Sequence, residues 1–149
     1  MPSTKPTTDQ ALQLDNQLCF ALYSASLAMT KLYKLLLAEL GLTYPQYLAM
    51  LVLWERDGLM VSELGERLFL DSGTLTPLLK RLEAAGLIAR IRALDDERRV
   101  HVTLTAAGRK LKARAARIPA CVADAVQCPL PEIVSLTRQV QALRQRLTA

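Results

Sequence analysis

The sequence predicts a mainly α-helical protein with a small β-hairpin, and three observations lead to this fold class. Apolar residues recur at helical spacing over most of the 149 residues. Glycine and proline divide that pattern into several separate helices. Residues 87–104 instead alternate apolar and polar side chains with period two, which is typical of paired strands.

The N-terminal third predicts two helices. Residues 12–40 contain no glycine or proline and carry leucines at helical spacing, so we expect one long helix there. Gly41 ends it in the manner of a C-terminal glycine cap. Pro45 opens a second helix, which runs to about Arg56 and stops near Gly58.

A compact pair of helices follows. In the first, Ser62 is the expected N-cap residue ahead of Leu64 and Leu68. The second begins in the polar cluster DSGT and ends at Gly86. Pro77 lies close to its start, so at most about one backbone hydrogen bond is lost. The expected buried stripe of this helix consists of Leu75, Leu78, Leu79 and Leu82.

The hairpin and two further helical patterns complete the chain. The strands are residues 87–92 and 100–104, joined by the polar loop 95–98. Thr105 caps a basic helix whose pattern is interrupted at Pro119. A last helix, roughly 131–147, has apolar residues at the spacing of a coiled-coil seam. The seam residues are Ile133, Leu136, Val140, Leu143 and Leu147.

Two helices, a short turn between them and a basic hairpin after them follow the order of a winged helix-turn-helix. Residues 80–117 hold eleven bases and four acids, a net charge of +7 in a chain whose total is +5. This segregation favours a face that binds a polyanion. The alternative, which composition alone does not exclude, is that these charges only solvate helix surfaces.

The candidate DNA-binding side chains lie on the second helix of the pair and on the hairpin tip. Opposite the leucine stripe, hydroxyl and basic groups can donate to base edges and phosphates in a major groove. These are Ser72, Thr74, Thr76, Lys80 and Arg81. At the tip, Arg98 and Arg99 suit a narrow, electronegative minor groove.

Composition argues against several other classes. No apolar run reaches the ~20 residues of a membrane span and the N-terminus lacks a signal core, so we expect a cytoplasmic protein without a membrane partner. The sequence has one histidine and no Gly-rich phosphate loop, so it lacks the residues that hydrolases and kinases need, and we expect no enzyme and no cofactor. A thiol peroxidase is the one enzyme that stays open as an alternative. Three cysteines and His101 could in principle bind zinc, but no cysteine pair has C-x2-C spacing, so no metal site is expected.

The stretch LDSGTLTPLLKRLEAAGLIARIRALDDERRVHVTLTAAG resembles the core of MarR-family regulators, including the wing motif Asp96-x-Arg98. LDNQLCFALYSAS and LDSGTLTPLLKRLE are similar to the organic hydroperoxide resistance regulator branch, OhrR. The resemblance runs from about Leu14 to Gly108. It implies a single MarR-type domain over residues 1–149, with Asp96 supporting the wing. The winged helix-turn-helix DNA-binding part is then 45–105, and the helical dimerisation part is 10–40 and 106–149.

The resemblance also implies a function and a set of redox residues. A homodimer would repress transcription from an inverted-repeat operator in double-stranded DNA, with Cys19 as the thiol that organic hydroperoxide oxidises. Tyr33 and Tyr44 of the partner subunit would support the thiolate by donating hydrogen bonds. Cys121 or Cys128 would then form an intersubunit disulfide; we favour Cys121, which lies well inside a helical pattern.

Three alternatives stay open at this point. Cys19 can be a small buried apolar residue, with the tyrosines as core filler. The repressor can instead be released by a small phenolic or other ligand in the cleft between subunits. It can also be a metal-sensing repressor.

Overall fold

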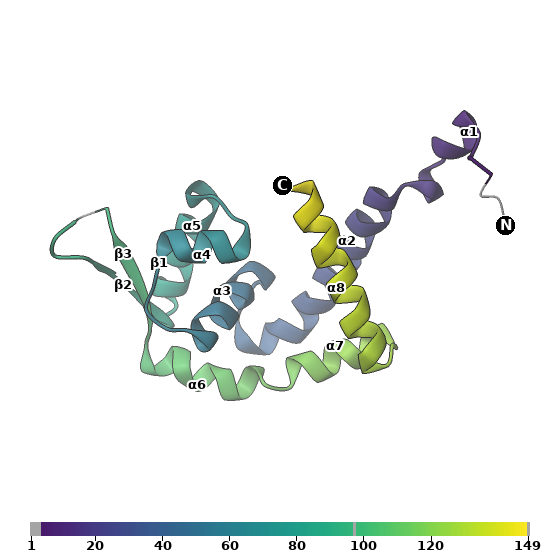
Figure 1. Ribbon diagram of the computed structural model, residues 1–149. Helices are drawn as coiled ribbons and strands as arrows, with labels where there is room; N and C mark the ends of the chain where they lie inside the picture. The colour runs from purple at the N-terminus through teal and green to yellow at the C-terminus, as the bar shows by residue number, and fades with distance from the viewer. Residues whose placement is uncertain (1–3, 97, 149) are drawn as a thin grey trace.

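The computed structural model describes residues 4–96 and 98–148. A winged helix-turn-helix part lies on one side of the molecule, α2 and α8 lie on the other, and α6 and α7 connect the two (Figure 1). The prediction of a mainly α-helical fold with a small β component is confirmed. In chain order the elements are α1 (Thr8–Ala11), η1 (Leu14–Asn16), α2 (Leu18–Leu37), η2 (Ala38–Leu40), α3 (Tyr44–Glu55), β1 (Leu59–Met60), α4 (Val61–Leu68), α5 (Ser72–Ala84), β2 (Ile88–Arg92), β3 (Val100–Leu104), α6 (Ala106–Ala115), α7 (Ile118–Val126) and α8 (Leu130–Leu147).

The N-terminal helix begins later than the sequence predicts, so the expectation of one helix over 12–40 is wrong. The chain forms the short turns α1 and η1 first, and α2 starts only at Leu18. Side-chain amides hold this bend: Asn16 donates to the carbonyl oxygen of Gln10 at 2.7 Å, and Gln17 donates to that of Ala11 at 2.7 Å. Gly41, with φ at 67°, ends the helical segment as predicted.

The helix-turn-helix agrees with the sequence except at one cap. Ser62 is not the N-cap of α4, because the helix begins one residue earlier, at Val61. The backbone N–H of Met60 donates to Glu63 at 3.1 Å and closes that end. In α5 all four residues of the predicted leucine stripe are buried, so the face of this helix that packs on the core is the predicted one.

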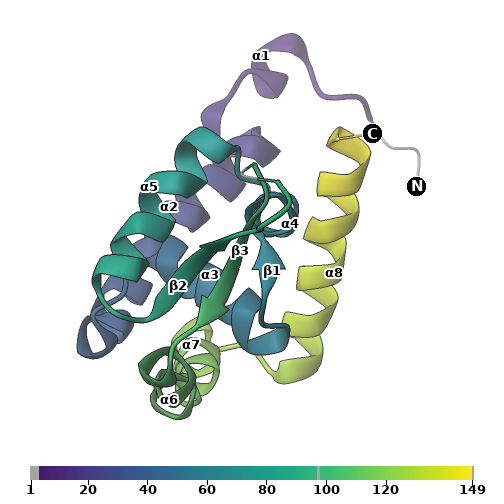
Figure 2. The same ribbon diagram turned by 90° about the vertical axis from the view of Figure 1, so that its left-hand side faces the viewer.

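The hairpin is part of a three-stranded antiparallel sheet in the order β1-β3-β2. β2 and β3 pair from Ile88↔Leu104 to Arg92↔Val100, close to the predicted strands. β1 was not predicted, because it has two residues, too few to show a period. Figure 2 shows β3 between its two neighbours, with the hairpin tip facing the viewer. Glu97, in the predicted loop, lies outside the described residues.

The C-terminal half follows the predicted order. Thr105 caps α6 by accepting a hydrogen bond from Gly108, and Pro119 lies in the first turn of α7. The end of α8 returns to the helix-turn-helix, where the Arg144 guanidinium lies 4.2 Å from the centre of the Phe69 ring. The α8 seam is largely uncovered: Leu136, Val140 and Leu147 are exposed.

One continuous apolar core runs from the end of α2 through the helix-turn-helix to α7. Its most deeply buried side chains are Leu37, Met50, Leu53, Leu64, Leu75, Leu79, Leu82, Ile88, Val102 and Ile118. Among the described residues, no single helix has the length and apolar composition to cross a membrane, although Leu18–Leu40 and Tyr44–Glu55, bent by 66°, pass that test when joined.

Candidate DNA interface and thiol site

The outward face of α5 carries the candidate DNA-binding residues. Asp71 caps the start of the helix by accepting a hydrogen bond from the backbone N–H of Thr74 at 2.8 Å. Hydrogen bonds from Thr74, with a smaller contribution from Gly73, hold the pKa of the Asp71 carboxyl below its usual range. Because the leucine stripe faces the core, the opposite face is left to polar groups. Ser72, Thr74, Lys80 and Arg81 are exposed, and Thr76 is half-buried.

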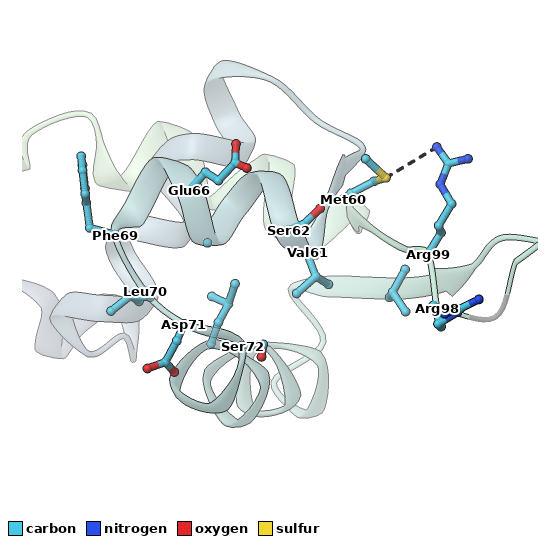
Figure 3. A pocket seen from close by; sticks show the side chains of 13 residues that line it. Met60, Val61, Ser62, Glu66, Phe69, Leu70, Asp71, Ser72, Arg98 and Arg99 are labelled. Atoms are coloured by element: carbon cyan, nitrogen blue, oxygen red, sulfur yellow. Dashed lines mark hydrogen bonds between the residues drawn. The ribbon is translucent and has the colours of Figure 1, made fainter. Parts of the chain in front are cut away.

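A groove of about 730 Å³ lies between α4, the start of α5 and the wing. Both Ser72, at the start of α5, and Arg98, on the wing, line this groove, and Figure 3 shows Arg99 near Met60. Arg99 donates to the Met60 sulfur at 3.7 Å, so a residue of the unpredicted strand β1 orients one of the wing arginines. The structure thus brings the start of the predicted recognition helix and the predicted wing residues to one concave surface.

Asp96 shapes the tip of the wing. Its carboxylate accepts the backbone N–H of Arg98 at 2.9 Å, and its backbone carbonyl accepts the N–H of Arg99 at 3.0 Å. The Arg98 guanidinium lies 3.6 Å from the same carboxylate yet is 95 % exposed. Asp96 therefore folds the turn while leaving the Arg98 side chain in solvent.

The basic window 80–117 is divided between two places. Of this window, only the wing residues Arg98, Arg99 and Val100 line the groove. The helix α6 starts at the base of the hairpin, at the end opposite the tip (Figure 1). Arg114 of α6 donates to the backbone carbonyl oxygen of Glu39 at 2.7 Å, and Arg117, which directly precedes α7, pairs with the Glu39 carboxylate. These two bases tie α6 and the start of α7 to η2, so the interpretation of the whole window as one polyanion-binding face was too broad.

Cys19 is exposed in the first turn of α2, where Gln17 provides no side-chain cap. Its side chain therefore lies near backbone N–H groups at the positive end of a 20-residue helix. The other two cysteines are half-buried: Cys121 is inside α7, whereas Cys128 follows the left-handed residue Gln127, which ends that helix. The two are thus not on one continuous helix.

Tyr33 and Tyr44 lie against each other, with ring centroids 4.5 Å apart. Tyr47 of α3 completes the cluster, with its ring centroid 5.8 Å from that of Tyr33. Burial, with a smaller effect of the neighbouring phenols, raises the pKa of Tyr33 to about 12, and burial also raises the pKa of Tyr44. Both phenols therefore keep their protons near neutral pH and remain hydrogen-bond donors.

Cys19 and Tyr33 are far apart within one chain. Both belong to α2, fourteen residues apart. At 1.5 Å per residue this corresponds to about 21 Å along the helix. A hydrogen bond between these two side chains therefore requires two copies of the chain.

Within residues 4–96 and 98–148, no group of three or more His, Cys, Asp or Glu side chains could hold a metal ion. His101 lies in β3 with its Nδ1 at 3.3 Å from the carbonyl oxygen of Gly58.

A helix-turn-helix followed by a basic wing, with hydroxyl and basic groups along a shared groove, defines a winged-helix DNA-binding protein. A family model described as "Transcriptional regulator SarA/Rot" matches residues 31–115, more than half of the chain. The chain belongs to the MarR-like winged-helix transcriptional regulators, and within them to the organic hydroperoxide resistance type.

Individual relatives support this assignment. The chain is 56 % identical over 111 residues to the organic hydroperoxide resistance transcriptional regulator of Bacillus subtilis, covering 74 % of this chain and 76 % of that protein. It is 50 % identical over 141 residues to the HTH-type transcriptional regulator TtmR of Methylorubrum extorquens, covering 95 % of this chain and 72 % of that one.

Among solved structures, the chain is similar to AbfR of Staphylococcus epidermidis. Reduced AbfR bound to DNA superposes with a TM-score of 0.80 at 33 % identity, covering 96 % of this chain and 100 % of that one. Disulfide-formed AbfR superposes with a TM-score of 0.64 at 34 % identity, covering 91 % and 95 %. The present fold is thus more similar to the reduced, DNA-bound form of AbfR than to its disulfide form.

Proposed function

We propose that this regulator is a cytoplasmic, homodimeric redox-sensing repressor that binds an inverted-repeat operator and leaves it when organic hydroperoxide oxidises Cys19. The observation that carries the proposal is the position of Cys19, exposed in the first turn of α2 and about 21 Å along the helix from Tyr33. The name of the Bacillus subtilis relative supports organic hydroperoxide as the signal.

DNA binding would use the surface around the groove. α5 enters a major groove, where Ser72, Thr74, Lys80 and Arg81 donate to bases and phosphates, and Thr76 adds a contact at its half-buried position. Arg98 and Arg99 reach into the neighbouring minor groove, held there by the turn that Asp96 folds. A two-fold dimer presents two such surfaces about one helical turn of DNA apart, which suits an inverted repeat.

Dimerisation would bury the apolar surface that a single chain leaves exposed. On α2, Leu18 and Tyr23 are more than half exposed, and on α8 so are Leu136 and Leu147. Both helices lie on the side of the molecule away from the wing (Figure 1). Apolar area of this kind is expected at a symmetric interface.

In the dimer, Tyr33 and Tyr44 of one subunit would donate hydrogen bonds to the Cys19 sulfur of the other. Because the two ring centroids are 4.5 Å apart, one subunit presents two neutral phenol groups side by side. Hydrogen bonds from neutral donors favour a thiolate over a thiol, and so does the positive end of α2.

The chemistry proceeds in two balanced steps. The Cys19 thiolate attacks the terminal peroxide oxygen, the O–O bond breaks, and the products are a sulfenic acid and an alkoxide that takes a proton to become the alcohol. The thiol of Cys121 of the partner subunit then attacks the sulfenic sulfur, so that a disulfide forms and water leaves. The Cα atoms in a disulfide lie within about 7 Å, so if the two thiols start farther apart, α2 and α7 must move to close the bond, and the recognition helices coupled to them move as well.

A second candidate function is release by an apolar small ligand. A largely apolar cavity of about 590 Å³ lies between the end of α2 and the start of α3, lined in part by Leu35, Leu42, Tyr44 and Pro45. This observation favours the ligand-gated alternative, since such a volume accommodates a small molecule. The two functions differ in whether Cys19 is required.

The disulfide step is tested on non-reducing gels after treatment with cumene hydroperoxide. Wild-type protein should become a covalent dimer, and Cys121→Ser should stay monomeric on the gel, with Cys128→Ser as the matched control that still crosslinks. Loss of the crosslink in Cys128→Ser alone would make Cys128 the resolving residue. A crosslink in Cys19→Ser would contradict the proposed site.

A further inference from the structure

Glu83 lies in the last turn of α5 and faces the edge of the sheet. β2 is an edge strand of the sheet, because among the described residues it is paired with β3 on one side and with no strand on its other side. The outward backbone N–H groups of an edge strand need another partner. The N–H of Arg90 finds one in Glu83, to whose Oε2 it donates at 3.1 Å.

The same carboxylate also holds the Arg90 side chain. Nη2 of Arg90 donates to Oε1 of Glu83 at 3.1 Å, so both carboxylate oxygens are used by one residue of β2. The side chain of Arg90 is 26 % exposed, and its Nε is buried without a hydrogen-bond partner among the described residues. This guanidinium is therefore turned into the protein and is not offered to DNA.

Taken alone, the negative charge of the Glu83 carboxylate is unfavourable for DNA binding. The hydrogen bonds from Arg90 hold the pKa of the Glu83 carboxyl below its usual range, so it is an anion at neutral pH. It lies two and three residues from the exposed bases Arg81 and Lys80 of the recognition helix. An anion here repels phosphate and offsets part of the attraction of those bases.

We propose that Glu83 is a positioning residue for DNA binding, which fixes the wing relative to α5 and thereby strengthens operator binding despite its charge. The inference rests on the proposed use of α5 and the wing as the two DNA-binding elements. It assigns to the pair Glu83–Arg90 the role of a brace between them.

The length of the wing explains why a brace is needed. From Arg90 to Asp95, near the tip, is five residues, or about 17 Å of strand at 3.3 Å per residue. A rotation of about 10° at the level of Arg90 therefore moves the tip by about 3 Å, which is the full length of a hydrogen bond. Arg98 and the α5 side chains can contact one DNA site together only if that angle is held.

The test compares Glu83→Gln with Glu66→Gln. Glu66 is also an exposed acid, it lines the groove that contains Arg98, and its side chain has no hydrogen bond to another described residue. Affinity is measured by fluorescence anisotropy over a range of salt, on duplex DNA from upstream of the protein's own gene and on a random duplex of equal length. The active fraction is measured by stoichiometric titration, which separates weaker binding from partial unfolding.

Loss of the brace should weaken binding of the upstream duplex about fivefold in Glu83→Gln, with less effect on random DNA and no change in the salt slope. Glu66→Gln should bind more tightly than wild type, because it removes a negative charge from the groove and breaks no hydrogen bond between the described residues. Arg90→Met should weaken binding to a similar extent, and the double variant should be no weaker than either single one.

Unchanged or tighter binding of the upstream duplex by Glu83→Gln would overturn the inference, because a solvated acid on a DNA-binding helix behaves in that way. Additive losses in the double variant would overturn it as well. Arg98→Ala and Lys80→Ala distinguish this failure from failure of the proposed interface. If those two variants bind like wild type, the interface itself is wrong and the brace has no role in it.

Discussion

Tyr33→Phe tests whether the thiol of one subunit is activated by the other. The substitution removes one phenol donor and leaves the ring, which packs on Tyr44 and Tyr47. A hydrogen bond to a charged group contributes about 1.5–3 kcal/mol, and about 1.4 kcal/mol is a factor of ten. We therefore expect oxidation of Cys19 to slow by about tenfold, with DNA affinity of the reduced protein unchanged.

The structure requires this effect to act between chains. Since Cys19 and Tyr33 are fourteen residues apart on α2, about 21 Å separate them within one subunit. Because the pKa of Tyr33 is raised to about 12, the phenol stays protonated throughout the neutral range and is available as a donor there.

Mixed dimers made from two differently tagged chains separate the two possibilities. In the first, a Cys19→Ser chain is paired with a Tyr33→Phe chain, so the remaining Cys19 faces an intact tyrosine of the other chain. In the second, a wild-type chain is paired with a chain that carries both substitutions, so the remaining Cys19 faces phenylalanine. Sulfenic acid formation is followed by mass spectrometry with a dimedone trap.

The first mixed dimer should react at the wild-type rate per thiol, and the second about tenfold more slowly. The reverse order would show that the tyrosine acts within its own chain, which contradicts the distance along α2. Equal rates in both would refute the assignment of Tyr33 as a thiolate-supporting residue.

Three further outcomes follow from the structure. The logarithm of DNA affinity should fall linearly with the logarithm of salt concentration, and Arg98→Ala should reduce the slope by about one phosphate contact, or about 0.9; a slope of zero for wild type would rule out phosphate contacts. Leu136→Glu places a charge in the exposed α8 seam and should convert a dimer to a monomer in sedimentation, whereas an unchanged mass would remove α8 from the interface. Gly108→Ala places a Cβ 2.1 Å from the Leu87 carbonyl oxygen, which accepts a hydrogen bond from the N–H of Thr105. The substitution should lower the free energy of unfolding in urea by about 3 kcal/mol. A decrease below about 1 kcal/mol would mean that the backbone relaxes freely at this close approach.

The elements that could be predicted from the sequence are those in which the apolar pattern and the caps agree. The four buried leucines of α5 recur at helical spacing, and Thr105 caps α6 as its position indicated. Such local signals depend on residues within one or two turns, so they are visible without a fold.

The bend before α2 and the strand β1 were missed for physical reasons. The bend depends on amide side chains that bond to carbonyls four to six residues back, and such bonds leave no period in the sequence. β1 consists of Leu59 and Met60, which pair with Val102 and His101 across more than forty residues of chain.

The candidate sites divide in the same way. Cys19, Tyr33 and Tyr44 were identified through the family resemblance, but the third ring, Tyr47, joins them only through packing of α3 on α2. Glu83 and Arg90 are separated by the turn at Gly86, and nothing in their spacing indicates that one carboxylate binds two groups of the same residue.

The most direct test of the redox switch is the release of DNA by peroxide. A duplex from upstream of the protein's own gene is titrated with wild-type protein and with Cys19→Ser, each with and without cumene hydroperoxide, and binding is followed by fluorescence anisotropy. We expect both reduced proteins to bind equally, the oxidised wild type to lose the duplex and regain it after reduction with dithiothreitol, and Cys19→Ser to stay bound throughout. Full release of Cys19→Ser by the peroxide would contradict the account and leave the ligand-gated repressor as the better description.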